Sequence, residues 1–322
     1  MSQYVCITVV LIATLLAVAS IITAYYIYKG VFVYKTGDRE EADYIPDSVF
    51  YAGVRAELAE CMDDMKNEPS EAVTVMSYDG LKLYGRFYRG QEDAPVVIFF
   101  HGYHGTYMRD GYGMFRLCRD RGYGILMVDE RAHGKSAGDT VTFGINEMQD
   151  CLSWIKLADN IYHTDAGIII AGVSMGASAV LMAAGSKDGT AIPESVRAVV
   201  SDCAFTSVRD IIRSMCVKMH YPVNISYTLA RLGAKLFGHI DIGSSDTASA
   251  LRAVESIRIP VMFIHGSSDS VVPASMCDRL YNACSSYKRR VIINGSEHAV
   301  NALTDYAVYE AAVGKFIDEV YG

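Results

Sequence analysis

Two serines in this chain stand in the pattern Gly-x-Ser-x-Gly, in which a serine hydroxyl can serve as a nucleophile. Ser136 lies in GKSAG and Ser174 lies in GVSMG. The pattern alone does not choose between them, because a nucleophilic serine also needs a buried strand just before it and a helix just after it. The sequence around each serine therefore decides.

Only Ser174 has this context. The apolar, β-branched run 168–173 precedes it, and small residues and good helix formers follow it. A sharp turn there would expose the hydroxyl and place it at a helix N-terminus, which stabilises negative charge. Ser136 instead follows an expected strand that ends near Asp129, and no helical pattern comes after it. A phosphate loop around Ser136 is also excluded, because that motif requires glycine at the position of Asp129.

A nucleophilic serine needs a base to accept its proton. His298 is the candidate base, because it lies in NGSEHAVN after the last expected strand, at the same edge of the sheet as Ser174. His101 and His265 each end a strand just before a glycine. We interpret these two histidines as structural residues of turns.

The base in turn needs an acid that orients it. Asp269 lies in HGSSDSVVP, the loop after the preceding expected strand, and is the candidate acid. The order serine, aspartate, histidine is one of the three known orders for such triads. Asp202, after an earlier strand, is the next candidate if Asp269 fails.

Backbone N–H groups complete the chemistry that this pattern predicts. The segment HGYHG, residues 101–105, follows the third expected strand. The N–H groups of Tyr103 and Met175 could both point at the oxygen that becomes negative during attack on a carbonyl, forming an oxyanion hole. HGYHG alone could be a plain glycine loop, but its position in the order of the other motifs favours the oxyanion hole.

The elements that must hold these residues alternate between strands and helices. Asp79-Gly80 predicts a hairpin between the first two strands. The later strands are continuous apolar runs of the kind that is buried on both faces. The pattern predicts an α/β fold with a mostly parallel central sheet and helices on both faces. Expected strands are 72–78, 81–88, 95–102, 124–130, 166–174, 197–205, 259–266 and 289–295, with helices near Asp47–Lys66, Ile145–Leu157, from Met175, Ala274–Ala283, and from Asn301 to the end.

One connection between strands is unusually long. Residues 206–258 are rich in aromatic residues, methionine and leucine. Connections of this length are commonly functional, and a lid is one example. We call this segment the cap insertion.

With these motifs the chain resembles serine hydrolases of the α/β-hydrolase superfamily. Within it, the chain is similar to bacterial membrane-anchored α/β-hydrolase-domain proteins related to monoacylglycerol-lipase-like and serine-aminopeptidase-like enzymes. The resemblance covers residues 72–322 and rests on HGYHG, DERAHGKS, GVSMG, GSSDSVVP and GSEH. It implies the α/β-hydrolase fold with a helical cap above the substrate pocket. It also implies that DERAHGKS supports the site without being catalytic, with Ala132 where the family usually has glycine.

The first 28 residues contain no charge and form an apolar stretch long enough to cross a bilayer as a helix. Tyrosines and Lys29 end this stretch, as in an interfacial anchor. A secretory signal would have a basic start and a shorter apolar core. We therefore expect residues 5–28 to be a single membrane span. Basic residues follow the span and none precedes it, which places the catalytic domain in the cytoplasm.

The bulk composition fits a folded domain and excludes one class of partner. Hydrophobic residues make up 51% of the chain and charged residues 20%, with a net charge of −8. We find no basic stripe with interleaved aromatics, so we expect no nucleic-acid partner. The seven cysteines after the span have neither CxxC pairs nor metal-ligand spacing, as in a reduced compartment.

The sequence thus predicts a membrane-anchored serine hydrolase that cleaves a carboxylic ester or related acyl bond without metal or cofactor. The expected substrate is a small acyl ester or amide, and the apolar cap insertion makes a lipidic acyl group one candidate. A peptidase or acyltransferase with the same triad, or a non-enzymatic scaffold that kept the fold, are the alternatives. The oligomeric state is not predicted.

We divide the chain into a transmembrane anchor (1–30), a juxtamembrane linker and helix (31–71) and an α/β-hydrolase domain (72–322). Every motif lies in the last part. A chain that begins near Asp43 is therefore expected to keep its turnover of a small soluble ester.

Overall fold

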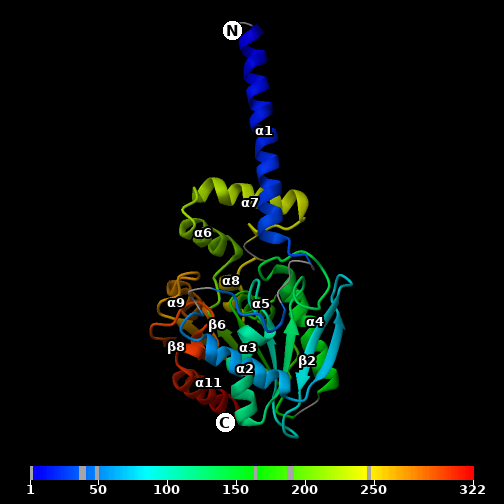
Figure 1. Ribbon diagram of the computed structural model, residues 1–322, viewed down its shortest axis with the longest axis vertical. Coiled ribbons are helices and arrows are strands. Elements are labelled where there is room, and N and C mark those ends of the chain that lie inside the picture. Colours follow the sequence, from blue (N-terminus) through cyan, green and yellow to red (C-terminus); the bar gives the residue numbers. More distant parts are fainter. Residues whose placement is uncertain (1–2, 36–40, 48–50, 163–164, 187–191, 245–247) are drawn as a thin grey trace.

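The computed structural model describes residues 3–35, 41–47, 51–162, 165–186, 192–244 and 248–322. Its centre is an eight-stranded sheet with the strand order β1-β2-β4-β3-β5-β6-β7-β8 (Figure 1). The strands are β1 (Glu71–Met76), β2 (Lys82–Tyr88), β3 (Val96–Phe100), β4 (Gly124–Asp129), β5 (Ile168–Val173), β6 (Val196–Asp202), β7 (Val261–Gly266) and β8 (Lys288–Ile293). Strand β2 pairs antiparallel with β1 and β4, and the remaining pairs are parallel.

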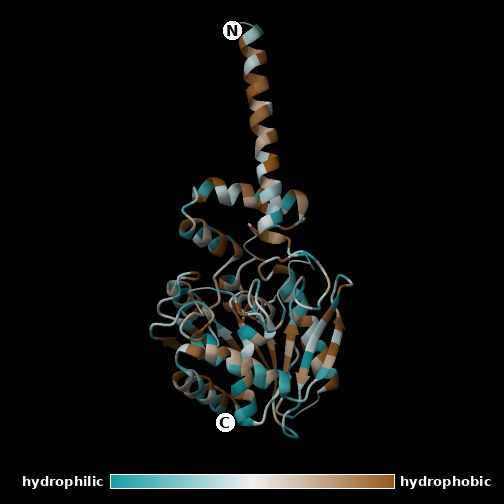
Figure 2. Ribbon diagram, viewed as in Figure 1, coloured by the Kyte–Doolittle hydropathy of each residue, from teal (hydrophilic) through white to brown (hydrophobic). Residues whose placement is uncertain are grey.

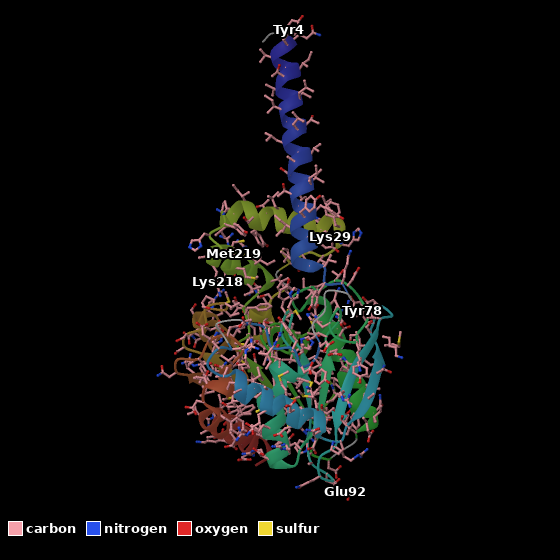
Figure 3. All side chains as sticks on the ribbon, viewed as in Figure 1. Tyr4, Lys29, Tyr78, Glu92, Lys218 and Met219 are labelled. Atoms are coloured by element: carbon pink, nitrogen blue, oxygen red, sulfur yellow. The ribbon has the colours of Figure 1, made fainter. Side chains whose placement is uncertain are left out.

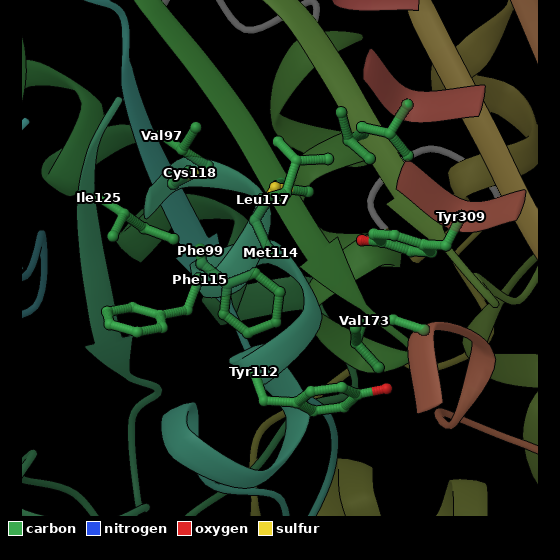
Figure 4. Close-up of a cluster of buried hydrophobic side chains, with 14 of the residues drawn as sticks. Val97, Phe99, Tyr112, Met114, Phe115, Leu117, Cys118, Ile125, Val173 and Tyr309 are labelled. Carbon is green, nitrogen blue, oxygen red and sulfur yellow. The ribbon is translucent and has the colours of Figure 1, made fainter. Parts of the chain in front are cut away.

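Helices cover both faces of this sheet. One layer holds α2 (Arg55–Asn67), α3 (Tyr107–Arg121), α10 (Asn301–Thr304) and α11 (Tyr306–Tyr321). The other holds α4 (Ile145–Ile161), α5 (Met175–Ala184), α8 (Ala250–Val254) and α9 (Ala274–Ala283). Alternate residues of β3 therefore point into different cores: Val97 and Phe99 meet α3 (Figure 4), and Ile98 packs in the opposite cluster. This confirms the predicted fold class.

Some predicted elements have different bounds in the structure. Helix α2 begins at Arg55 rather than near Asp47, although residues 48–50 of that prediction lie outside the described residues. The expected C-terminal helix is divided at Asp305, whose extended backbone ends α10 and whose side chain accepts a hydrogen bond from the Val308 N–H to cap α11. Helix α3 fills the connection from β3 to β4, where no helix is predicted from the sequence.

The described residues of the cap insertion form three helices with two different positions. Helices α6 (Val208–Lys218) and α7 (Val223–Phe237) lie above the sheet, on the side from which α1 leaves the domain (Figure 1). Helix α8 instead packs against α5 and α9 in the body of the domain. The part that stands above the body is therefore α6 and α7.

Helix α1 (Gln3–Phe32) is long, apolar and exposed over most of its length (Figure 2). It is long and apolar enough to cross a membrane, and a signal sequence would have the same properties. Its C-terminal end is different, because Ala24, Tyr28 and Phe32 are buried against the protein. A side chain on Gly233 of α7 would collide with the Ala24 carbonyl, so the two helices meet backbone to backbone.

The end of α1 also packs onto the HGYHG loop (His101–Gly105). The Tyr103 hydroxyl donates a hydrogen bond to the Val31 carbonyl at 2.9 Å. The Tyr34 ring stacks on His104 with the ring centres 4.0 Å apart. The Phe32 ring contacts Phe143, with ring centres at 5.6 Å. Residues 31–34, which the sequence had placed in a linker, thus cover the loop that carries Tyr103.

These contacts change the expectation for a shortened chain. A chain that begins at Asp43 should unfold at a lower temperature than one that begins at Ala24, although both lack the exposed part of α1. Losing residues 24–42 uncovers the apolar surface around Phe143, and each large side chain that becomes exposed costs about 1.5–3 kcal/mol. We expect a difference of at least about 5 °C in melting followed by circular dichroism in one detergent. Equal melting temperatures would show that this segment does not stabilise the domain.

Candidate active site

Ser174 occupies a strained turn between β5 and α5. Its φ of 54° and ψ of −110° lie in a region that residues other than glycine rarely adopt. Such strain costs of order 1–3 kcal/mol and is concentrated at functional sites. The glycines on either side make the turn possible, because a side chain on Gly176 would collide with the Phe100 carbonyl and one on Gly172 would overlap the Gly176 backbone.

A chain of two hydrogen bonds starts at this serine. The Ser174 Oγ lies 2.8 Å from Nε2 of His298, and Nδ1 of His298 lies 2.7 Å from Oδ2 of Asp269. The carboxylate can only accept, so Nδ1 carries the proton and Nε2 is left to accept from the serine hydroxyl. The structure thus brings together the serine, histidine and aspartate that the sequence singled out, from the loops after β5, β8 and β7.

Asp269 is fixed by its own loop. Its Oδ1 accepts hydrogen bonds from the backbone N–H groups of Val271 at 2.9 Å and Val272 at 2.8 Å. Burial raises the pKa of Asp269, but hydrogen bonds from His265 and His298 outweigh burial and hold this pKa well below its usual range. The carboxylate is therefore ionised when it faces His298, as an orienting acid requires.

His265 has a closer relation to this acid than its sequence suggested. The sequence predicts a turn residue here, and Nε2 of His265 does donate to the Val272 carbonyl at 2.9 Å. The same nitrogen also lies 3.3 Å from Oδ2 of Asp269. Burial lowers the pKa of His265, yet the hydrogen bond to Asp269 raises it overall, to about 10. The only signal in the sequence was its position at the end of β7, four residues before Asp269.

His101 has the structural role that we assigned to it. Its Nδ1 donates to the Gly102 carbonyl at 2.8 Å, and its Nε2 accepts from the Glu130 N–H at 3.0 Å. Both bonds are satisfied by the neutral ring. Burial lowers the pKa of His101 to about 4, which keeps the ring neutral.

Asp202, the reserve candidate for the acid, points elsewhere. It is buried and accepts a hydrogen bond from Nδ2 of Asn301 at 2.5 Å. Among the described residues, no hydrogen bond joins Asp202 to His298. Burial raises the pKa of Asp202 to about 6. Asp269 is therefore the carboxylate that faces His298.

Ser136 lies inside the protein and holds two strands together. Its hydroxyl donates to the Asp129 carbonyl at 2.6 Å and accepts from the Tyr84 N–H at 2.8 Å. Arg131 of the same motif is also structural, since it makes two hydrogen bonds to buried Asp150. Ala132 has a φ of 61°, which explains why glycine is usual at this position.

The HGYHG loop is held against Ser174 from several sides. The Gly102 N–H donates to Asp110 of α3 at 2.8 Å, and a Cβ on Gly102 would lie 3.3 Å from that of Ser174. Arg109 donates to the His104 carbonyl at 2.6 Å. The backbone N–H groups of Tyr103 and Met175 have no acceptor among the described residues, so both are available to a ligand.

One group near the site could in principle bind a metal ion. Ligand atoms of Cys203, Asp269 and His298 lie within 4.8 Å of one another. Both nitrogens of His298 are already engaged by Asp269 and Ser174. Burial raises the pKa of the Cys203 thiol well above its usual range, which disfavours the thiolate that metals need. These residues fit a proton-transfer chain better than a metal site.

Comparison with known proteins agrees with this geometry. A family model described as the alpha/beta hydrolase fold matches residues 95–222, which include the HGYHG loop and Ser174. The protein YqkD of Bacillus subtilis is 27% identical over 252 residues, covering 74% of this chain and 77% of the relative.

Solved structures give the same result. The esterase Pf2001 of Pyrococcus furiosus has a TM-score of 0.63 at 20% identity, covering 88% of this chain and 98% of that one. Est1E of Butyrivibrio proteoclasticus, solved with ferulic acid bound, has a TM-score of 0.59 at 18% identity, covering 77% and 99%. Both neighbours therefore share the fold over almost their entire length.

The family model and the solved structures rest on different information, one on residue patterns and the other on the path of the backbone. Both agree with the fold described above. The chain therefore has the α/β-hydrolase fold.

Proposed function

We propose that the protein is a serine hydrolase that cleaves a carboxylic ester or related acyl bond through a covalent acyl-enzyme. The observation that carries this proposal is the continuous hydrogen-bonded chain Ser174–His298–Asp269, with 2.8 Å and 2.7 Å between the bonded atoms. A structural role for Ser174 would not require its strained backbone. A nucleophile does require it, because the turn exposes the hydroxyl above the sheet.

Each residue has a definite part in the proposed reaction. Ser174 Oγ attacks the acyl carbonyl while Nε2 of His298 accepts its proton, and Asp269 stabilises the resulting imidazolium. The N–H groups of Tyr103 and Met175 donate to the oxyanion of the tetrahedral intermediate. His298 then protonates the leaving alcohol. A water molecule then attacks the acyl-enzyme carbonyl while His298 accepts its proton. His298 returns this proton to Ser174 Oγ as the acyl group leaves as an acid.

An ester is the proposed substrate class. The solved neighbour Pf2001 is described as an esterase, and Est1E was solved with ferulic acid bound. Both descriptions support an ester over an amide as the substrate. A peptidase or acyltransferase would use the same residues, and no contact in the site favours either. We further propose that α1 is a retained membrane span and that the hydrolase domain lies on the cytoplasmic side, where Lys29 follows the span.

The first test compares the two serines of the Gly-x-Ser-x-Gly motifs. Ser174→Ala should abolish hydrolysis of p-nitrophenyl esters and labelling by a fluorophosphonate probe, because it removes the attacking oxygen. Ser136→Ala should still be labelled, although it should melt at a lower temperature because the half-buried Tyr84 N–H loses its acceptor, at about 1 kcal/mol. Labelling of Ser174→Ala, or its loss in a folded Ser136→Ala, would contradict the assignment.

The second test compares two buried aspartates with opposite expectations. Asp269→Asn should lower kcat by about 10³–10⁴-fold, since an amide donor facing His298 forces the wrong tautomer of the ring. Asp202→Asn should stay within a few-fold of the parent, because the new amide oxygen can still accept from Asn301. Ester turnover at pH 8 measures both. If Asp202→Asn is the inactive variant, the acid is wrongly assigned.

A further inference from the structure

Helix α7 is apolar on two opposite faces. Tyr227, Ala230 and Ala234 form the face that is buried against the protein. The opposite side carries an outer stripe at helical spacing i, i+4, i+7 and i+11, made of apolar side chains that are exposed or half-buried: Ile225, Leu229, Leu232 and Leu236. A surface helix normally has one apolar face, with polar residues opposite to it. The outer stripe is therefore unusual for a face in contact with water.

Other exposed apolar side chains continue this surface. They lie at the end of α6, in the turn that leads to α7 and at the end of α7: Val217, Met219, Tyr221 and Phe237. Figure 3 shows Met219 in this turn and Lys29 in the last turns of α1. Tyr25 of α1 joins the same surface, since its ring centre lies 5.1 Å from that of Phe237.

The length of α1 shows what lies at this level. Residues 3–23 are exposed throughout, and Ala24 is the first buried residue of the helix. These 21 residues span about 31 Å of helix, which matches the hydrocarbon core of a bilayer. Ala24 is also the residue that meets Gly233 of α7 backbone to backbone. A membrane that contains the exposed part of α1 therefore ends where α7 crosses it (Figure 1).

The charge of this region suits the surface of an anionic bilayer. Residues 206–242 contain five basic and two acidic side chains, an excess of three positive charges in a chain whose net charge is −8. On α7 the basic residues Arg231 and Lys235 form a stripe beside the outer stripe. A helix with an apolar face flanked by basic residues binds in the interfacial plane of anionic membranes.

We propose that the outer stripe of α7 and the α6–α7 turn lie in the interfacial layer of the bilayer that α1 crosses. The proposal rests on α1 being a membrane span. The occupant of this surface is the lipid itself, with its acyl-chain boundary against the outer stripe and its anionic headgroups beside Arg231 and Lys235. The cap is then held against the membrane at two places, by α1 and by α7.

Tryptophan fluorescence can test this in the full-length protein. The chain has a single tryptophan, Trp154, which is buried in the core of the domain. Ile225→Trp adds a reporter on the outer stripe, where the native side chain is 63% exposed. Tyr321→Trp is the matched control at the C-terminus, at the far end of the domain from α1 (Figure 1). Ile12→Trp reports on the middle of the exposed part of α1.

The three variants are reconstituted in vesicles of phosphatidylcholine and phosphatidylglycerol that contain brominated phosphatidylcholine. We expect bromines near the headgroup end of the acyl chain to reduce the fluorescence that Ile225→Trp adds to that of Trp154 at least about twofold, because interfacial helices sit about 5–10 Å into this boundary. The Tyr321→Trp signal should not change. Ile12→Trp should be quenched best by bromines near the end of the acyl chain.

Each other outcome overturns the proposal in a way that can be identified. Quenching of Ile12→Trp without quenching of Ile225→Trp would keep the span and remove α7 from the membrane, as if a second copy or a protein partner covered the outer stripe. Absence of quenching in both would show that α1 is not a span. Ester turnover and probe labelling of the same variants, which the change at Ile225 should leave intact, report separately on the proposed hydrolase activity.

Discussion

The close approach of α5 to the ends of β3 and β5 is the constraint on which the site depends. Gly172 and Gly176 allow it, since a side chain on either would meet backbone atoms. The approach forces Ser174 into its strained conformation and places the first N–H groups of α5 beside the HGYHG loop. The loops after β7 and β8 leave the sheet at the same edge as the loop after β5, because these strands are parallel. Asp269 and His298 therefore lie close to Ser174.

Most of the sheet and of the candidate site could be predicted from the sequence, because both depend on patterns within short segments. The buried strands are continuous apolar runs, so β3, β4, β5 and β7 were located within one or two residues. Ser174, His298 and Asp269 follow such runs directly, and their order along the chain limited the choice of partners. The site came from short-range patterns joined by one rule about where parallel strands end.

The features that were missed depend on contacts between distant parts of the chain. The Tyr103–Val31 hydrogen bond joins residues 72 positions apart, and the sequence near these two residues does not predict it. The second contact of Asp269, with His265, depends on how one loop folds back on its own strand. The position of α7 against α1 depends on Gly233, which has no side chain to collide with the Ala24 carbonyl. The sequence around Gly233 does not show that Ala24 is its neighbour.

The packing of α1 also bears on whether this helix is retained or removed as a signal. A signal peptidase would have to cut after a small residue such as Ala19 or Ala24. Ala24 is fully buried within an unbroken helix, and Gly233 lacks a side chain at the point where the Ala24 carbonyl touches it. Cleavage there would remove the contact to which α7 is fitted and leave a gap beside Tyr28. A cut after Ala19 would leave this contact in place, so the packing argues against cleavage at Ala24 and assigns the turns of α1 from Ala24 onward to the cap and to the support of Tyr103.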